Sequence, residues 1–223
     1  MSGEFRLIVR GKSTDGLVSK YLNRRLSTRL TLLIIKYGIP LTPNQVSLIS
    51  FLIGIASAIT YVLGNYVLGA ILIQISSIID GVDGELARAL GRCSSLGAFI
   101  DALLDRFVDL SVIAAITYSL IASGTVNPIT AYLVGTTALT GDLLVSYLHA
   151  RGEASLKEHL ARIGSIPNFA SRDVRLFMIF ILTLFNLKLV ALASVAILSY
   201  TYVLSKLIEV YLKLRSVGGG SHG

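Results

Sequence analysis

Long apolar stretches separated by short polar breaks recur along most of the chain. Most of these stretches reach about 20 residues, the length that an α-helix needs to cross a bilayer. The breaks hold glycine, asparagine and proline, which end helices and form turns. The pattern predicts an all-α integral membrane protein with six transmembrane helices, over approximately residues 44–63, 66–90, 95–123, 128–149, 172–185 and 189–212.

Local signals predict where several of these helices begin and end. Thr42 followed by Pro43 is typical of a helix start, with a side chain that caps the first turn and proline at the first helical position. Gly64-Asn65 predicts a tight turn between the first two spans. Either Ser94 or Ser95 is expected to cap the third span.

The segment before the first span has a different pattern. Between Asp15 and Tyr37, leucines alternate at helical spacing with lysines and arginines. A basic amphipathic helix of this kind would lie in the interface of an anionic membrane, and the alternative is a soluble helix packed on a partner domain. We expect an interfacial helix over residues 15–37, preceded by a linker over 1–14. A membrane domain over 42–215 follows, and residues 216–223 have the composition of a tag remnant.

Composition strengthens the membrane prediction. Of the 223 residues, 53% are hydrophobic, and the mean hydropathy is +0.73, which is too apolar for a soluble domain. The first residues contain charges and no apolar run, so no signal peptide is expected. Cys93 is the single cysteine, so no internal disulfide is possible, and a reducing cytosolic face fits.

The net charge of +7 is unevenly placed along the sequence. Lysines and arginines gather before the first span, in the turn at 88–92, in the 151–175 region and near residue 215. The three opposite turns contain only Lys188. Because cytoplasmic loops carry the excess of basic residues, we expect the basic end to face the cytoplasm and the protein to lie in the plasma membrane.

Four aspartates fall within 26 residues in the middle of this apolar chain. Asp80 and Asp83 are three residues apart, and Asp101 and Asp105 are four apart, so each pair shares one face of a helix. Two such helices in contact would bring four negative charges together, which is tolerable around cations. Carboxylate oxygens are hard ligands that favour Mg²⁺, Mn²⁺ or Ca²⁺ over zinc.

Two other interpretations of the acidic residues stay open at this point. The aspartates could be ion-pair partners of Arg88, Arg92 or Arg106, although this leaves the small residues beside them unexplained. They could instead line the path of a cation transporter or channel. Such a path does not require the small residues and the arginine that accompany the acids, Gly84, Ala87, Arg88 and Gly97.

These residues form the pattern D-x2-D-G-x2-A-R-x8-G-x3-D-x3-D, complete from Asp80 to Asp105. The pattern resembles the signature of the CDP-alcohol phosphotransferases, and the six predicted spans and the amphipathic helix also fit that family. The resemblance implies an enzyme that transfers a phosphate-linked alcohol from a CDP-alcohol to an acceptor hydroxyl and releases CMP. It also implies a homodimer.

The resemblance assigns roles to the residues of the motif. Asp80, Asp83 and Asp101 would hold two divalent cations, Mg²⁺ or Mn²⁺. Asp105 would also reach a metal and would act as the general base on the acceptor hydroxyl. The residues expected to border the CDP moiety are Asn44, Gly84, Ala87, Arg88 and Gly97.

A second basic cluster suggests the acceptor. Arg151, Arg172 and Arg175 flank the polar segment before the fifth span. They are either ordinary cytoplasmic charges or a pocket for a phosphate on the acceptor, since arginine forks pair well with phosphate oxygens. The sequences around them resemble segments of family members that use an inositol phosphate as acceptor.

The stretch from Lys12 to Arg29 resembles the start of the membrane domain of di-myo-inositol-phosphate-phosphate synthases, which are often fused behind a cytidylyltransferase. This resemblance implies CDP-inositol as donor and inositol 1-phosphate as acceptor, with a fused or separate cytidylyltransferase as a further partner. The alternative is a CDP-linked lipid donor, which would give a phosphatidyl- or archaetidylinositol phosphate. The bilayer is the remaining expected partner, and no nucleic acid is expected.

Overall fold

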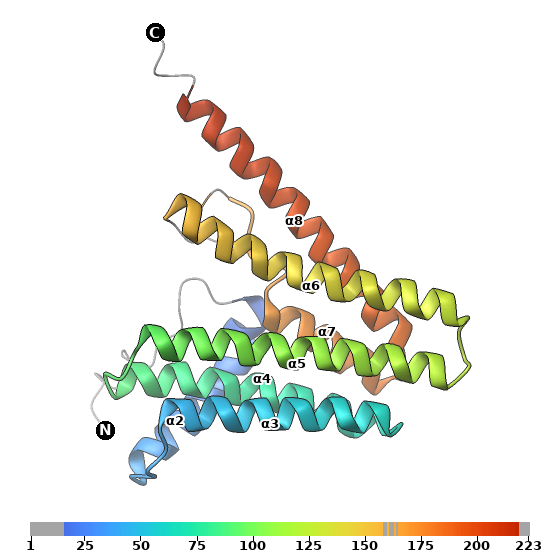
Figure 1. The fold of residues 1–223 in the computed structure, drawn as a ribbon. Helices are drawn as coiled ribbons and strands as arrows, with labels where there is room; N and C mark the ends of the chain where they lie inside the picture. The colour runs from blue at the N-terminus through green and yellow to red at the C-terminus, as the bar shows by residue number, and fades with distance from the viewer. Residues whose placement is uncertain (1–15, 158–159, 161–162, 164, 219–223) are drawn as a thin grey trace.

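The computed structural model of the protein describes residues 16–157, 160, 163 and 165–218. These residues form helices and connecting turns, with no strand among them (Figure 1). The expected linker over 1–14 and the end of the expected tag remnant lie outside the described residues. The helices are η1 (Ser19–Asn23), α2 (Arg24–Lys36), α3 (Pro43–Val62), α4 (Tyr66–Ala89), α5 (Ser95–Ala122), α6 (Pro128–Leu156), α7 (Arg172–Leu184) and α8 (Lys188–Gly218).

The all-helical class is confirmed, and four helices are long and apolar enough to cross a membrane: α3, α4, α6 and α8. Helix α5 has 28 residues but contains Asp101, Asp105, Arg106 and Asp109 within its first 15. Helix α7 has 13 residues, so it is about 20 Å long, which is less than the thickness of the hydrocarbon core. The prediction of six spans is therefore supported for four helices by length and composition.

The predicted caps are present at the starts of the helices. Thr42 Oγ1 accepts a hydrogen bond from the backbone of Gln45, and the Gln45 side chain accepts one from the backbone of Thr42 at 2.8 Å. Ser94, rather than Ser95, caps α5 by accepting a hydrogen bond from Gly97 N at 3.0 Å. The turn at Gly64 has a positive φ of 81°, which glycine adopts without strain.

The helices form one bundle in which α3 packs against α4 and α5, α6 packs against α8, and α7 packs against α4 and α8. The C-terminal part of α8 extends beyond the other helices (Figure 1). The main core is apolar and includes Tyr61, whose hydroxyl lies 2.6 Å from Thr183 Oγ1. Gly54 allows α3 and α5 to approach closely, because a Cβ there would lie 2.5 Å from a Val108 methyl carbon.

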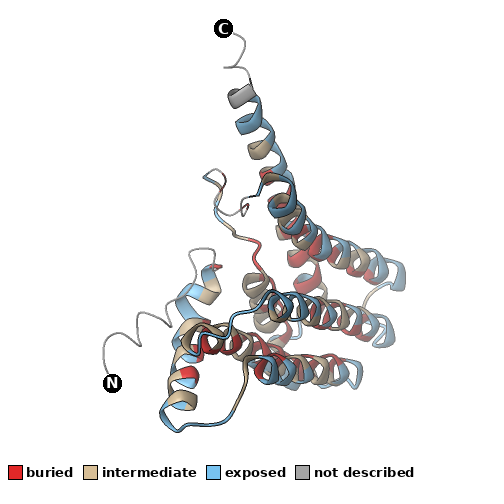
Figure 2. Ribbon diagram, turned by 60° about the vertical axis from the view of Figure 1, so that its left-hand side comes forward, coloured by how far each residue is buried: buried red, intermediate tan, exposed pale blue. Residues whose placement is uncertain are grey.

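Large apolar side chains also cover the outside of the bundle. Figure 2 shows exposed residues along the outer sides of the helices and buried residues along the sides that face the bundle. The exposed fractions of Leu52, Phe107 and Ile197 are 57%, 60% and 69%. This surface matches hydrocarbon rather than water, as a multi-pass membrane protein requires.

Helix α2 and the preceding π-helical turn η1 lie against α4 with their polar side inward. Asn23, Ser27 and Thr31 are buried, whereas Leu26 and Leu30 are about 40% exposed. The basic segment is therefore helical over most of the predicted range, and its apolar face points away from the protein. A location in the membrane interface stays a prediction.

Candidate active site

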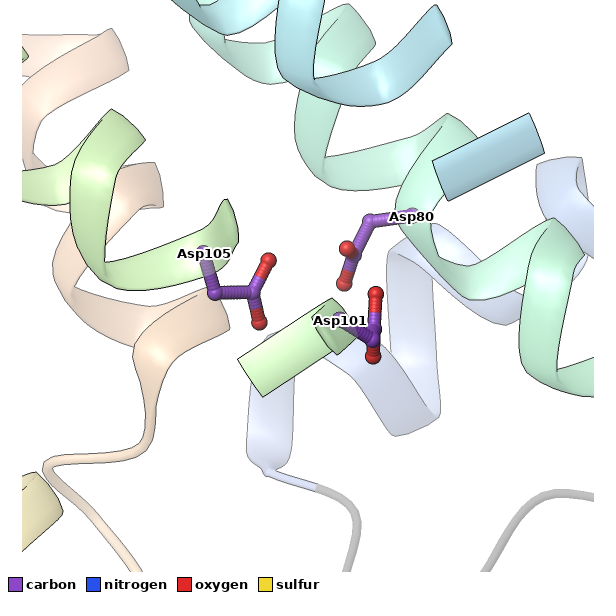
Figure 3. A group of neighbouring side chains, drawn as sticks. All are labelled: Asp80, Asp101 and Asp105. Atoms are coloured by element: carbon purple, nitrogen blue, oxygen red, sulfur yellow. The ribbon is translucent and has the colours of Figure 1, made fainter. Parts of the chain in front are cut away.

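The acidic residues of the motif converge where the C-terminal half of α4 meets the N-terminal half of α5. One carboxylate oxygen from each of Asp80, Asp101 and Asp105 lies within 4.8 Å of the other two. Figure 3 shows the three side chains pointing toward one another from the two helices. Helices α4 and α5 both pack against α3, which holds the end of one motif half near the start of the other.

Asp83 lies at the edge of this group. It accepts a hydrogen bond from the hydroxyl of Ser47 on α3, and its exposed fraction is 7%. Its side chain lines both of the cavities that meet at the acidic residues. The structure thus brings three of the predicted ligands into one group and places the fourth next to it.

Two cavities of about 270 Å³ each meet at Asp83 and Asp101. The first, which we call the acidic cavity, contains Asp80 and Asp105 and lies between α4, α5, the start of α7 and the N-terminal helices. The second, which we call the motif cavity, lies between the starts of α3 and α5 and the end of α4. The residues that were expected to border the nucleotide, Asn44, Gly84, Ala87, Arg88 and Gly97, all line the motif cavity.

Arg88 lines both cavities, and two of its three guanidinium nitrogens are unpaired among the described residues. Its Nε and Nη2 atoms are buried and have no hydrogen-bond partner within the described part of the chain. A buried guanidinium without an acceptor is costly, so these donors fit an anionic ligand in the cavity.

Gly97 keeps the motif cavity open. A Cβ at this position would lie 2.9 Å from Ser94 Oγ and 3.4 Å from Asn44 Oδ1. A side chain would therefore occupy the space between the start of α3 and the start of α5.

Arg172 from α7 compensates the charge of the acidic group. Its guanidinium lies 3.1 Å from Asp80, 2.9 Å from Asp105 and 3.0 Å from Asp109. From the sequence, the candidate ion-pair partners of the aspartates were Arg88, Arg92 and Arg106. For Asp80 and Asp105 the partner is instead Arg172, which is 92 and 67 residues away in the sequence.

The other two arginines of the predicted acceptor pocket lie elsewhere. Arg175 is 2% exposed, and it pairs with the Asp142 carboxylate at 2.6 Å and the Asp142 carbonyl at 2.9 Å. Arg151 is exposed on α6, and neither residue lines the acidic or the motif cavity. Of the three, Arg172 alone reaches the acidic cavity.

Buried ion pairs continue from the site into the bundle. Arg106 lies 2.9 Å from Asp109 and 3.2 Å from Asp142, and it also donates to the hydroxyl of Ser146. Asp142 thereby joins Arg106 to Arg175. This network accounts for the burial of Asp109 and Asp142, two acids outside the motif, because each has an arginine partner.

Sequence reasoning missed the contribution of the N-terminal helices to the site. Gly16, Ser19, Asn23 and Arg24 line the acidic cavity opposite the aspartates. The polar side of the amphipathic pattern was the available signal for this contribution. On a helix lying free on the membrane that side would face water, whereas here it faces the acidic cavity.

The donor set of the acidic group fits hard divalent cations. Three carboxylates that converge within 4.8 Å of one another, with a fourth beside them, offer oxygen ligands of the kind that Mg²⁺ and Mn²⁺ prefer. The net negative charge of such a group would be reduced by a bound cation, as it is by Arg172.

The comparison with protein families agrees with this geometry. Residues 40–207, which include every residue of the motif, match the family described as CDP-alcohol phosphatidyltransferase. The chain belongs to this family. It is therefore a transferase, and the family assignment favours an enzyme over the transporter alternative.

Curated relatives with similar sequences include bifunctional proteins and archaetidylinositol phosphate synthases. The bifunctional IPC transferase and DIPP synthase of Thermococcus kodakarensis is 39% identical over 186 residues, which are 82% of this chain and 40% of that protein. The archaetidylinositol phosphate synthase of Pyrococcus horikoshii is 33% identical over 175 residues, 78% of this chain and 86% of that protein. The chain thus spans less than half the length of the bifunctional relative.

Solved structures share the fold. The phosphatidylinositol phosphate synthase of Mycobacterium tuberculosis with CDP-DAG bound superposes with a TM-score of 0.68 at 22% identity, and the match covers 84% of this chain and 94% of the other. A second structure of that protein, in complex with manganese and citrate, gives a TM-score of 0.66 at 24% identity.

The acidic group generates a prediction about metal binding. Asp101→Asn removes one charged ligand from the group, so we expect the affinity for Mn²⁺ to fall by more than about tenfold. Titration of the purified protein with Mn²⁺, followed by electron paramagnetic resonance, measures this affinity without any substrate. Glu153→Gln, which removes an exposed carboxylate on α6, is the matched control. Equal affinities of Asp101→Asn and the parent protein would contradict the metal assignment.

Proposed function

We propose that this protein transfers an inositol-phosphoryl group from CDP-inositol to inositol 1-phosphate, giving phosphorylated di-myo-inositol phosphate and CMP. The observation that carries this proposal is the meeting of the motif cavity and the acidic cavity at converging carboxylates, with unpaired donors of Arg88 between them. The choice of inositol substrates is supported by the bifunctional IPC transferase and DIPP synthases, which are 34–39% identical to this chain.

A second candidate is the synthesis of a phosphatidyl- or archaetidylinositol phosphate from a CDP-linked lipid and the same acceptor. The archaetidylinositol phosphate synthase of Pyrococcus horikoshii supports this candidate, because the match extends over 86% of that protein. The two candidates share the CDP moiety and the acceptor, and they differ only in the alcohol that the donor carries.

The motif residues take the roles that the family resemblance implies. Asp80, Asp83 and Asp101 hold two divalent cations, and Asp105 also reaches a metal. When bound, Mg²⁺ or Mn²⁺ neutralises the charge of the pyrophosphate and of the leaving CMP. A related structure that contains manganese supports this assignment. The nucleotide contacts are Asn44, Gly84, Ala87, Arg88 and Gly97.

Asp105 is the proposed general base. The acceptor hydroxyl oxygen attacks the phosphorus that carries the donor alcohol, the bond from this phosphorus to the CMP oxygen breaks, and Asp105 takes the hydroxyl proton. An alcohol is a weak nucleophile at neutral pH, so a positioned base accelerates this step by about 10²–10⁴-fold. Asp105 lies one helical turn beyond Asp101 and lines the acidic cavity but not the motif cavity, which supports a role away from the proposed nucleotide site.

Arg172 is the proposed contact of the acceptor phosphate. It lines the acidic cavity next to Asp105, so a phosphate on its guanidinium would bring an acceptor hydroxyl near the base. Arg175 and Arg151 belong to the same predicted pocket, and their positions suggest supporting roles. Arg175 fixes the first turns of α7 through Asp142, and Arg151 adds positive charge at the same end of the bundle.

The membrane arrangement completes the proposal. All six helices α3–α8 cross or enter the bilayer, the basic end with the active site faces the cytoplasm of the plasma membrane, and α2 lies in the interface. The protein forms a homodimer, as the family resemblance implies. A cytidylyltransferase, fused or separate, supplies CDP-inositol, and the name of the bifunctional relatives supports this partner.

A donor panel tests the function. With the protein in detergent and inositol 1-phosphate as acceptor, we expect CMP release from CDP-inositol, and much less from CDP-diacylglycerol or CDP-archaeol. No release is expected without Mg²⁺ or Mn²⁺. CMP release from a lipid donor alone would favour the second candidate, and none from any donor would contradict both.

Asp105→Asn separates the base from the metal ligands. We expect turnover to fall by about 10²–10⁴-fold, because the amide cannot accept the proton, while metal-dependent binding of the CDP-alcohol is retained. Single-turnover CMP release and equilibrium binding of the donor measure the two effects. Loss of donor binding together with turnover would instead place Asp105 among the essential metal ligands.

Arg172 requires a substitution that keeps its positive charge, because it also pairs with Asp80 and Asp105. Arg172→Lys retains the charge and loses the planar fork that suits a phosphate. We expect the KM for inositol 1-phosphate to rise about tenfold and the KM for the CDP-alcohol to change little, as one charge-assisted hydrogen bond is lost. Arg29→Lys, on an exposed residue of α2 that lines neither cavity, is the control. Equal changes in both KM values would remove Arg172 from the acceptor pocket.

A further inference from the structure

Glu85 is a fully buried carboxylate inside the motif, at one of its variable positions. Both of its oxygens are bonded to α2. Oε1 lies 2.7 Å from Arg24 Nη1 and 2.7 Å from Ser27 Oγ. Oε2 lies 2.8 Å from Thr31 Oγ1. A buried carboxylate is stable only when its charge is compensated and its lone pairs are occupied, and here α2 supplies these donors.

The contact between α2 and α4 is polar along most of its length. The Asn23 side chain donates to Ser77 Oγ at 3.1 Å and accepts from Gln74 Nε2 at 2.9 Å. Gly81 allows the helices to approach, because a Cβ there would lie 3.2 Å from Ser27 Oγ. These residues form a polar seam, Asn23 of η1 and Arg24, Ser27 and Thr31 of α2 with Gln74, Ser77, Gly81 and Glu85 of α4.

Apolar burial contributes to the contact mainly near the end of α2. There, Ile34 and Ile35 pack against a small cluster that includes Val82 and Leu86. Farther back the leucines of α2 point outward and are about 40% exposed, so they do not attach the helix to the bundle. The seam hydrogen bonds therefore determine where the first half of α2 lies, and in surroundings of low polarity such bonds are strong.

This first half of α2, together with η1, forms one wall of the acidic cavity. Ser19, Asn23 and Arg24 line the cavity opposite the aspartates. The start of the segment is also attached to α7, since Ser19 N donates to Asp173 Oδ2 at 2.5 Å. No residue of η1 or α2 lines the motif cavity. The wall therefore bounds the space assigned to the acceptor and not the space assigned to the nucleotide.

We propose that Glu85 is a positioning residue that holds the N-terminal helices as the acceptor-side wall of the acidic cavity. Glu85 touches neither substrate, and it acts through Arg24 and the hydroxyls of α2. The fixed wall limits how an acceptor lies between Arg172 and Asp105, so its loss affects acceptor recognition more than donor binding. The acceptor part of this inference rests on the proposed function, whereas the attachment of α2 does not.

The test compares Glu85→Gln and Arg24→Gln with Arg25→Gln in the full chain, in nanodiscs. Arg25 is exposed on the same helix, so its substitution removes the same charge without touching the seam. We expect the first two variants to raise the acceptor KM about tenfold and to change the donor KM and the Mn²⁺ affinity less than about threefold. Because both residues act through one contact, the double variant should be no worse than the more affected single variant.

Hydrogen exchange supplies a readout that does not depend on activity. We expect the backbone amides of α2 to exchange faster in Glu85→Gln and Arg24→Gln than in the parent and Arg25→Gln. Unchanged exchange in Glu85→Gln, or a donor KM that rises as much as the acceptor KM, would overturn the inference. If the parent protein shows no transferase activity, the proposed function fails, and the exchange data still decide whether Glu85 holds α2.

A milder variant covers the case in which Glu85→Gln does not fold. Thr31→Val preserves the shape of the side chain and removes only the hydroxyl beside Oε2. We expect faster exchange in α2 and a rise in the acceptor KM of about threefold, as one of the hydrogen bonds to Glu85 is lost. Exchange and acceptor KM equal to those of the parent in both Thr31→Val and Arg24→Gln would overturn the inference.

Discussion

The rest of the structure depends on the cost of gathering carboxylates in an apolar bundle. Asp80, Asp101 and Asp105 lie within 4.8 Å of one another, and mutual repulsion and lost hydration both oppose this arrangement. Arg172 offsets part of the cost from the side of α7, and divalent cations are suited to offset more. The fold must therefore bring α4, α5 and α7, from three parts of the chain, together at the acidic group.

Much of this arrangement is readable in the sequence, because the residues concerned are close along the chain. Asp101 and Asp105 share a face through helical periodicity, and Ser94 caps the start of α5. The family resemblance, rather than the spacing, grouped Asn44 with Gly97, and both line the motif cavity. Such local patterns survive folding, since helix geometry fixes them before any tertiary contact forms.

The features that the sequence did not reveal are contacts between distant segments. Nothing near Arg172 or Arg175 tells that the first faces the acids and the second is bound to Asp142 in the bundle interior. Likewise, nothing in the sequence around Glu85 distinguishes it from a surface glutamate. In the structure, the polar side of α2 covers it. A helix of a soluble protein usually buries its apolar face, but α2 buries its polar face. This orientation is favourable where the surroundings are lipid.

The shortness of α7 determines where along the bundle its first turn lies. A helix of 13 residues is shorter than the hydrocarbon core of a bilayer, and Ala170 and Ser171, which precede it, are already buried. The first turn of α7 thereby brings the Arg172 guanidinium to the level of Asp80 and Asp105. Under the proposed function, a water-soluble acceptor would have to enter this recess, whereas an alcohol carried by a lipid would arrive there from the side.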